Sequence, residues 1–330
     1  MRRHRTSRGQ TDLDWDGRAA RWPRGSGGLV PGGDSNIWMC AQDVETEIWA
    51  HFYRLERRFG RYDVEPLRLD ACSDELRDLL IESLPYSEHR DDLSSAVANF
   101  AKMVAQGFVI DGLMPFEVQA GWNQSAKTSR LEGVRLVFVY PESMKKLGPW
   151  LFQIVPPHEN HETTESRPVR LDPERIVRFE PPRHYRQALA QMRSGFRWIG
   201  RSEHEWMMKA GTGQMQEDFK AVTRSYNVCR ARLSAPIGWD GRGAFRDHVA
   251  EFHLALRRLR WQRFCIEIRD GILTTLAKVF TKIGEWRGES PHLVWGHLPT
   301  LEQVQHAESQ LMSGTVGFDE VFKAFSYLSR

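Results

Sequence analysis

The sequence has few cysteines and no long apolar run, and each shortage excludes a class of protein. Cys40, Cys72, Cys229 and Cys265 are far apart and form no C-x-x-C pair, so neither a zinc knuckle nor a disulfide framework is indicated. No uninterrupted apolar run approaches the ~18 to 20 residues that cross a bilayer. The arginine-rich N-terminus lacks the apolar core of a secretory signal. We expect a reduced, intracellular setting and no membrane partner.

The sequence also lacks the short motifs of common catalytic sites. The glycine-rich stretch GGLVPGG is not followed by G-K-[ST], so it is not a phosphate loop. Neither a G-x-S-x-G elbow nor a G-x-G-x-x-G after a strand is present. The stretch HENHE at 158–162 places its histidines in a polar loop instead of on the helical face that zinc requires. We therefore expect no catalytic residue, no cofactor and no metal.

The net charge is small and its excess lies at one end. Lys and Arg number 46 against 43 Asp and Glu, which gives +3. Residues 1–36 alone carry this surplus, and the rest of the chain is balanced. Because this segment is rich in Gly, Ser and Asp and has no periodic apolar residues, we expect 1–36 to be a disordered basic arm. Its arginines are interpreted as a solvated tail, with non-specific nucleic-acid contact as the alternative.

The spacing of apolar residues after the arm predicts an α+β domain at 37–185. Helices are predicted at 37–58, at 73–84 with Ser73 as N-cap, and at 92–106 with Gly107 as the stop. After Gly107 the period changes to short runs rich in Val, Ile, Phe and Tyr. These runs, which include 175–182, predict the strands of one antiparallel sheet.

The second half of the chain is predicted to be helical. Residues 186–244 should hold two or three helices, with a break at Gly211 and Gly213 and a loop at 234–243. Residues 245–330 should hold a long helix, a short strand and loop at 292–299, and a terminal pair of helices. The predicted helices of this last part are 245–283, 301–312 with Thr300 near its start, and 318–328.

Two apolar rows run along the long predicted helix. Every seventh residue is apolar in the row Phe245, Phe252, Leu259, Ile266, Leu273 and Phe280, and Phe264, Ile268, Ile272, Leu276 and Val279 form a second row. At ~1.5 Å per residue such a helix spans about 50 Å or more. We expect a spine that packs against other elements along its length.

Arginines occupy the other side of this helix in its first half. A membrane-surface helix needs a free apolar face, and a base-reading helix has no deep apolar row, so packing is favoured over both. The arginine edge is then left to bind acidic neighbours, a second subunit or phosphates. The oligomer-interface candidates are Arg246, Arg257, Arg260 and Arg263.

Four stretches occur in an order that resembles the portal (head-tail connector) proteins of tailed bacteriophages. They are a helix running into a strand at Asn99–Val118, the strand series VRLVFVYPESM, PWLFQIVP and RLDPERIVRFEPP, a loop and long helix at Tyr226–Phe280, and the ending at Val294–Phe325. The resemblance covers about 37–325, and each motif alone is degenerate. The resemblance rests on the order and the spacing of the four stretches.

The resemblance implies a portal-like wing with an antiparallel sheet, a helical stem with a short clip-like linker, and one long spine helix. It further implies a ring, usually of twelve subunits, at one capsid vertex of a virion assembled in the host cytoplasm. Double-stranded DNA would pass through the ring. The implied partners are further copies of the chain, the terminase large subunit, a head completion or adaptor protein, and the major capsid protein.

The helices of 186–233 would then face the DNA channel. The best candidates for groups near DNA are Lys209, Lys220, Arg224, Arg230 and Arg232. Residue by residue, a solvated helix face explains them at least as well. The competing functional class is a cytoplasmic nucleic-acid-binding or regulatory protein that uses its Arg-rich arm.

Overall fold

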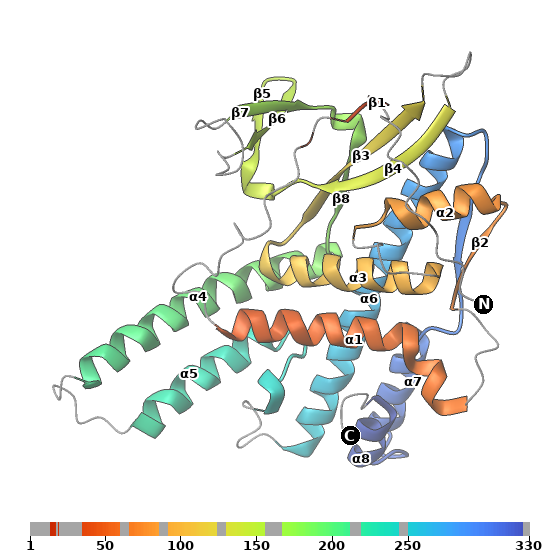
Figure 1. Ribbon diagram of the computed structural model, residues 1–330. Coiled ribbons are helices and arrows are strands. Elements are labelled where there is room, and N and C mark those ends of the chain that lie inside the picture. The colour runs from red at the N-terminus through yellow and green to blue at the C-terminus, as the bar shows by residue number, and fades with distance from the viewer. Residues whose placement is uncertain are drawn as a thin grey trace, which may run out of the picture.

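The computed structural model describes most of the chain as helices packed against antiparallel sheets (Figure 1). The described residues are 14–17, 19, 35–59, 66–85, 92–123, 130–155, 167–211, 219–243 and 250–325. The helical and antiparallel content confirms the predicted α+β class.

The three predicted N-terminal helices are all present. They are α1 (Ser35–Phe59), α2 (Asp74–Ser83) and α3 (Leu93–Ile110). The Oγ of Ser73 accepts a hydrogen bond from the N–H of Leu76 at 3.2 Å, so the predicted N-cap is confirmed. Helix α3 is long and apolar enough to cross a bilayer by composition alone, and its burial as a core helix accounts for that composition.

The prediction that Gly107 ends the third helix is wrong. Helix α3 continues to Ile110, and the chain turns at Gly112, whose φ is 92°. A Cβ atom on Gly107 would lie 2.1 Å from the Sδ of Met114. The glycine therefore serves the close packing of α3 against the following strand.

The strands form two antiparallel sheets where one was predicted. The larger contains β1 (Asp14–Trp15), β3 (Met114–Asn123), β4 (Arg130–Phe138) and β8 (Ile176–Phe179), and the smaller contains β5 (Met144–Leu147), β6 (Trp150–Val155) and β7 (Arg167–Leu171). Short 3₁₀ turns at Pro141–Ser143 and Pro173–Arg175 lead the chain into and out of the smaller sheet. Because each turn begins with a proline, which has no N–H for a ladder, the strands on either side separate there.

Two short strands outside these sheets pair across most of the sequence. The predicted strand near the C-terminus is β9 (His292–Trp295), and its partner is β2 (Leu67–Asp70). The sequence analysis did not find β2. It has only four residues, and a segment more than 200 residues away completes it.

The second half of the chain consists of five helices in its described part. They are α4 (Arg183–Gly211), α5 (Phe219–Ser234), α6 (Glu251–Glu285), α7 (Leu301–Met312) and α8 (Phe318–Phe325). The break after Gly211 is confirmed, and residues 212–218 lie outside the described ranges. Thr300, predicted near the start of this helix, is the N-cap of α7 and forms a capping box with Gln303.

The long helix α6 begins later than predicted. Its N-cap is Ala250, which has an extended backbone, and Phe245 and Val249 lie outside the described residues. The heptad row also does not face one partner. Leu259 and Ile266 are buried against α7 and α8, whereas Leu273 and Phe280 are buried in the main core. A row of every seventh residue drifts by about 20° per heptad on a straight helix, so it passes from one side to another.

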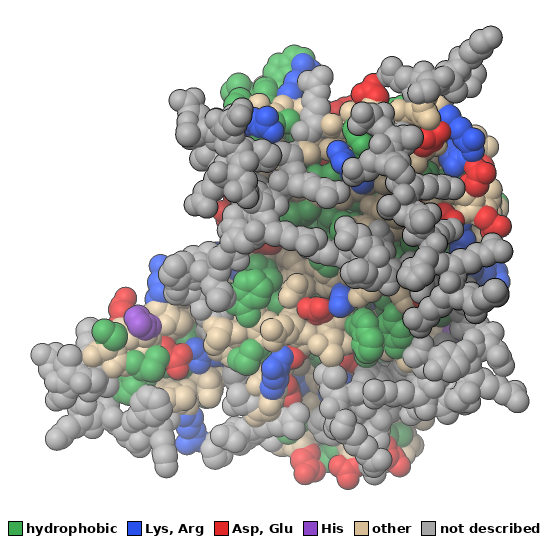
Figure 2. Space-filling model, in the orientation of Figure 1, with side chains coloured by type: hydrophobic (Ala, Val, Ile, Leu, Met, Phe, Trp, Pro, Cys, Tyr) green, Lys and Arg blue, Asp and Glu red, His purple; other side chains and the backbone are tan. Residues whose placement is uncertain are grey.

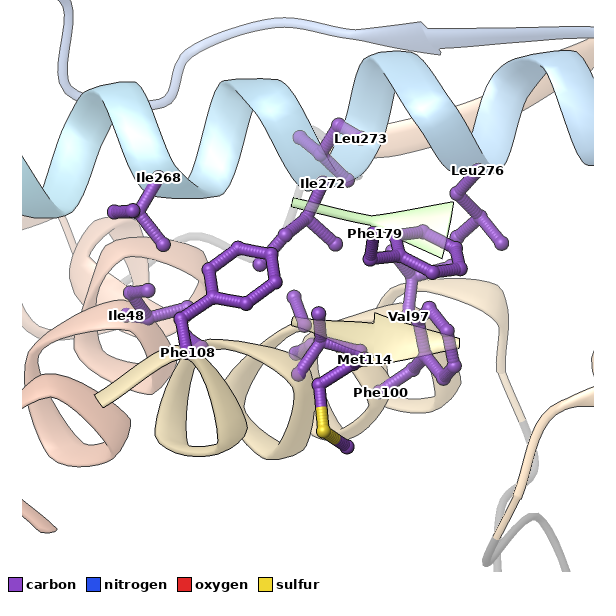
Figure 3. Packing of buried hydrophobic residues seen from close by; sticks show 14 of the residues in the cluster. Ile48, Val97, Phe100, Phe108, Met114, Phe179, Ile268, Ile272, Leu273 and Leu276 are labelled. Carbon is purple, nitrogen blue, oxygen red and sulfur yellow. The ribbon is translucent and has the colours of Figure 1, made fainter. Parts of the chain in front are cut away.

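The main core forms where α6 crosses α3 and the larger sheet (Figure 3). The rings of Phe100, Phe116 and Phe179 lie 5.2 to 5.6 Å apart between centroids. Ile272 and Leu276 of α6 point toward this aromatic group in Figure 3. The predicted spine is therefore confirmed as a buried helix, with partners on two faces.

Replacing Leu259 with Ala should lower the free energy of unfolding by about 2–5 kcal/mol, because the substitution leaves a cavity beneath α7 and α8. Urea unfolding followed by circular dichroism measures the change. The control is Lys278→Ala, which changes an exposed position of the same helix. Equal effects of the two substitutions would contradict the packing of the C-terminal helices on α6.

Candidate nucleic-acid interface on a projecting hairpin

Helices α4 and α5 form a hairpin that projects from the body (Figure 1). The first half of α4 is anchored by one buried face, which consists of Tyr185, Leu189, Met192, Phe196 and Ile199. Beyond Ile199 no described side chain of α4 is buried. The outer half of the hairpin therefore lies away from the core.

The two helices approach closely where they leave the body. A Cβ atom on Gly195 would lie 2.4 Å from the Cδ1 of Leu233, so the glycine lets the helices approach without a shift of that side chain. Arg193 donates to the backbone oxygen of Phe108 at 3.0 Å, which joins α4 to the end of α3. These contacts fix the direction in which the hairpin projects.

The base of α5 is held by arginine and tryptophan side chains from neighbouring elements. Arg257 of α6 donates to the backbone oxygen of Ala231 and, at 3.1 Å, to the Oγ of Ser234. Its cation lies at the C-terminal end of α5, where the helix dipole favours positive charge. The loop that follows is fixed by Trp239, whose Nε1 donates to Asp43 of α1 at 2.9 Å.

One arginine of the hairpin links its two helices. Arg230 of α5 is only 4% exposed and forms an ion pair with Glu203 of α4. It also donates to the Oδ1 of Asn227 at 3.3 Å. Arg230 therefore has a structural role within the hairpin, and its burial leaves little of the side chain accessible to DNA.

The hairpin carries a concentration of positive charge. Helices α4 and α5 together contain ten Lys or Arg and two Glu, a surplus of eight positive charges, and α5 has no acidic residue. Because the whole chain is only +3, the remainder is net negative. Arg197 and Arg201 of α4 and Arg224 and Arg232 of α5 are exposed, so much of this charge faces solvent.

The remaining predicted DNA-channel residues also belong to the hairpin. Arg224 and Arg232 are exposed on α5, whereas the side chains of Lys209 in α4 and Lys220 in α5 lie outside the described positions. Arg197 and Arg201 were missed. The net charge of each predicted helix, instead of single residues, would have pointed to these two arginines.

Large apolar side chains are also exposed on the hairpin. Trp198 is 61% exposed, Met208 is 64% exposed, and Met207 and Val228 are exposed as well. Figure 2 shows hydrophobic, basic, acidic and histidine side chains mixed on this projection. These side chains are candidates for contact with another protein.

The predicted oligomer-interface arginines occupy different environments. Arg257 holds α5, and Arg263 donates to Glu308 of α7 at 2.5 Å, so both serve contacts within the chain. Burial lowers the pKa of the Arg257 guanidinium, although an arginine stays charged at neutral pH. Arg260 is exposed beside a groove between α6 and α7. Arg246 lies outside the described residues.

No cluster suited to a metal ion occurs among the described residues. The stretch HENHE at 158–162 lies outside them. The hairpin instead offers exposed guanidinium groups, which bind phosphates through charge and hydrogen bonds.

No protein-family model matches the sequence, and a search of curated proteins finds no match. A structural comparison finds a chain described as "Virion of native gene transfer agent (GTA) particle". The match covers 93% of this chain and 91% of that chain, with a TM-score of 0.44 and 11% sequence identity. A likeness at this level supports no conclusion about function.

Replacing Arg230 with Ala should destabilise the hairpin by about 1–3 kcal/mol, because Glu203 loses its charged partner. Amide hydrogen exchange in α4 and α5 measures the loosening. Arg224→Ala is the matched control, since Arg224 lies on the same helix and is exposed. Similar exchange rates in both variants would show that Arg230 does not hold α4 and α5 together.

Proposed function

We propose that the chain is the portal subunit of a phage or prophage capsid. It would form a ring at one vertex, through which double-stranded DNA is packaged and ejected. The observation that carries this proposal is the surplus of eight positive charges on α4 and α5, of which Arg197, Arg201, Arg224 and Arg232 are exposed. A ring of such hairpins would line a channel with cations, and non-specific phosphate contact is the chemistry that a DNA channel requires.

The exposed apolar residues of the hairpin support assembly into a ring. In a monomer, Trp198 and Met208 remain in water. In a ring each hairpin has two neighbours, so these side chains can be buried between subunits. The same order of elements, in which a sheet is followed by a stem-like hairpin and a long helix, is what the sequence resemblance implies.

The proposal also includes the binding partners and the location that the resemblance to portal proteins implies. They are the terminase large subunit, a head completion or adaptor protein and the major capsid protein, at the vertex of a virion assembled in the host cytoplasm. No catalytic role is proposed, and packaging energy would come from another chain. The competing class, a regulatory protein with a nucleic-acid-binding arm, is distinguished by the first measurement below.

Native mass spectrometry should find an assembly of about twelve chains. Met208→Glu should reduce this assembly to smaller species, because a carboxylate would be buried at a subunit contact. The control is Gln191→Glu, which adds the same charge at an exposed position of the same helix near the body. A wild-type monomer that binds DNA would favour the regulatory alternative over the ring.

Replacing both Arg224 and Arg232 with Gln should weaken DNA binding and its dependence on salt. Each lost phosphate contact lowers the slope of log affinity against log salt by about 0.9, so the double variant should lose about 1.8. Fluorescence anisotropy with a labelled DNA duplex measures the slope. Arg68→Gln with Arg178→Gln is the control, because both arginines are exposed on the body. An equal loss in the control would show that the hairpin is not the DNA surface.

A further inference from the structure

Residues 14–17 and 19 lie against the larger sheet, although 1–36 was predicted to be disordered. The surface that they contact is called the groove, and it is formed by Glu117, Gln119, Trp122, Arg135 and Arg175. Strand β1 pairs antiparallel with β3 at Trp122 and Gly121, and the N–H of Asp16 donates to the oxygen of Ala120 at 3.0 Å. Strand β8 pairs with the first part of the same edge of β3. Segment 14–19 therefore continues the edge that β8 begins.

Asp16 is recognised by three donors from the groove. Its Oδ1 accepts from the N–H of Ala120 at 2.8 Å and from Arg175 at 2.5 Å, and its Oδ2 accepts from the Nε1 of Trp122 at 3.0 Å. Partial burial raises the pKa of this carboxyl, but the hydrogen bonds outweigh burial and leave the pKa below its ordinary value. The site is therefore built for an ionised carboxylate.

Ala19 is held by a buried carboxylate and a buried amide. Its N–H donates to the Oε2 of Glu117 at 2.7 Å, and its oxygen accepts from the Nε2 of Gln119 at 3.1 Å. Glu117 is 1% exposed and Gln119 is 0% exposed. Removing the segment would take a donor from a buried carboxylate, which is costly.

The groove also recognises the residues around Asp16 by shape. A Cβ atom on Gly17 would lie 2.0 Å from the Cγ of Gln119, so only glycine fits at that position. The guanidinium carbon of Arg135 lies 4.0 Å from the centroid of the Trp15 ring, in a cation–π contact. Together these contacts specify the sequence Trp-Asp-Gly-x-Ala, joined to the sheet by strand addition.

The residues that connect this segment to the body, 20–34, lie outside the described ranges. Fifteen residues, 20–34, join Ala19 to the start of α1, and they include five glycines and two prolines. Fifteen residues reach at most about 50 Å when extended, which is close to the length of α6. The contacts with segment 14–19 are the same whether the groove belongs to the same chain or to an adjacent copy, so exchange costs none of them.

We propose that segment 14–19 of one subunit occupies this groove on a neighbouring copy in the assembled protein. The inference rests on the proposed ring in one respect, which is that a second copy must lie within reach. If segment 14–19 binds a neighbouring copy, its contacts hold two subunits together. The same contacts within one chain add nothing to the stability of the assembly. Once copies are adjacent, a neighbouring segment competes with the chain's own segment at an effective concentration that the linker length sets.

A disulfide trap distinguishes exchange from docking within one chain. Asp14 and Trp122 are partners across β1 and β3, and such partners have Cα atoms about 5.5 Å apart or less, which suits a disulfide. The double variant Asp14→Cys with Trp122→Cys is prepared in a background in which Cys72 and Cys229 are serine. After mild oxidation of the assembled protein, non-reducing gel electrophoresis should show covalent multiples of the 38.3 kDa chain.

Mixing the single variants Asp14→Cys and Trp122→Cys, one of them enlarged by a tag, should give a heterodimer band. Adding Asp16→Ala should abolish the cross-links, because it removes the carboxylate that three donors recognise.

If the oligomer is intact and every disulfide is intramolecular, the exchange of segment 14–19 is wrong, whereas the ring proposal is unaffected. If no disulfide forms, segment 14–19 does not bind beside Trp122 in either arrangement. Native mass spectrometry of the unoxidised protein tests the ring independently.

Discussion

Burial of α6 on two faces is the constraint on which the rest of the structure depends. One face closes the main core against α3 and the aromatic group of Phe100, Phe116 and Phe179, and another face carries α7 and α8. Between these faces Gln262 donates to the buried Glu47 of α1 at 2.7 Å, and Arg258 lies 3.3 Å from the same carboxylate. A helix held this way cannot rotate without exposing one of its partners, so it fixes the frame from which the hairpin projects.

The arginines fall into two groups. Those near the body have partners within the chain, and those farther out on the hairpin are exposed. Near the body, Arg193 and Arg257 donate to backbone oxygens, and Arg230 pairs with a carboxylate. A guanidinium that leaves water must find such partners, because an unpaired buried charge is strongly destabilising. Farther out, Arg201 and Arg224 remain in solvent. Burial thus decides which cations serve the fold and which stay accessible to phosphates.

Features set by local chemistry were predictable from the sequence, and features set by distant contacts were not. Ser73 and Thr300 cap helices because their own hydroxyls reach the nearby backbone. Gly107 was misread because its role depends on Met114, and β2 was missed because β9 completes it. Arg224 and Arg230 are six residues apart on one helix, and only the position of Glu203 separates the exposed arginine from the buried one. The excess charge of the hairpin was visible in the sequence once residues were grouped by helix.

Ala19 lies where the two sheets meet. It is buried with Val137 and Val139 of the larger sheet region and with Leu151 and Leu171 of the smaller sheet. Ala19 therefore packs with apolar side chains from both sheets and belongs to the cluster that joins them. The N-terminal segment is thus part of the contact between the two sheets, and a chain without it loses one of the apolar side chains that both sheets share.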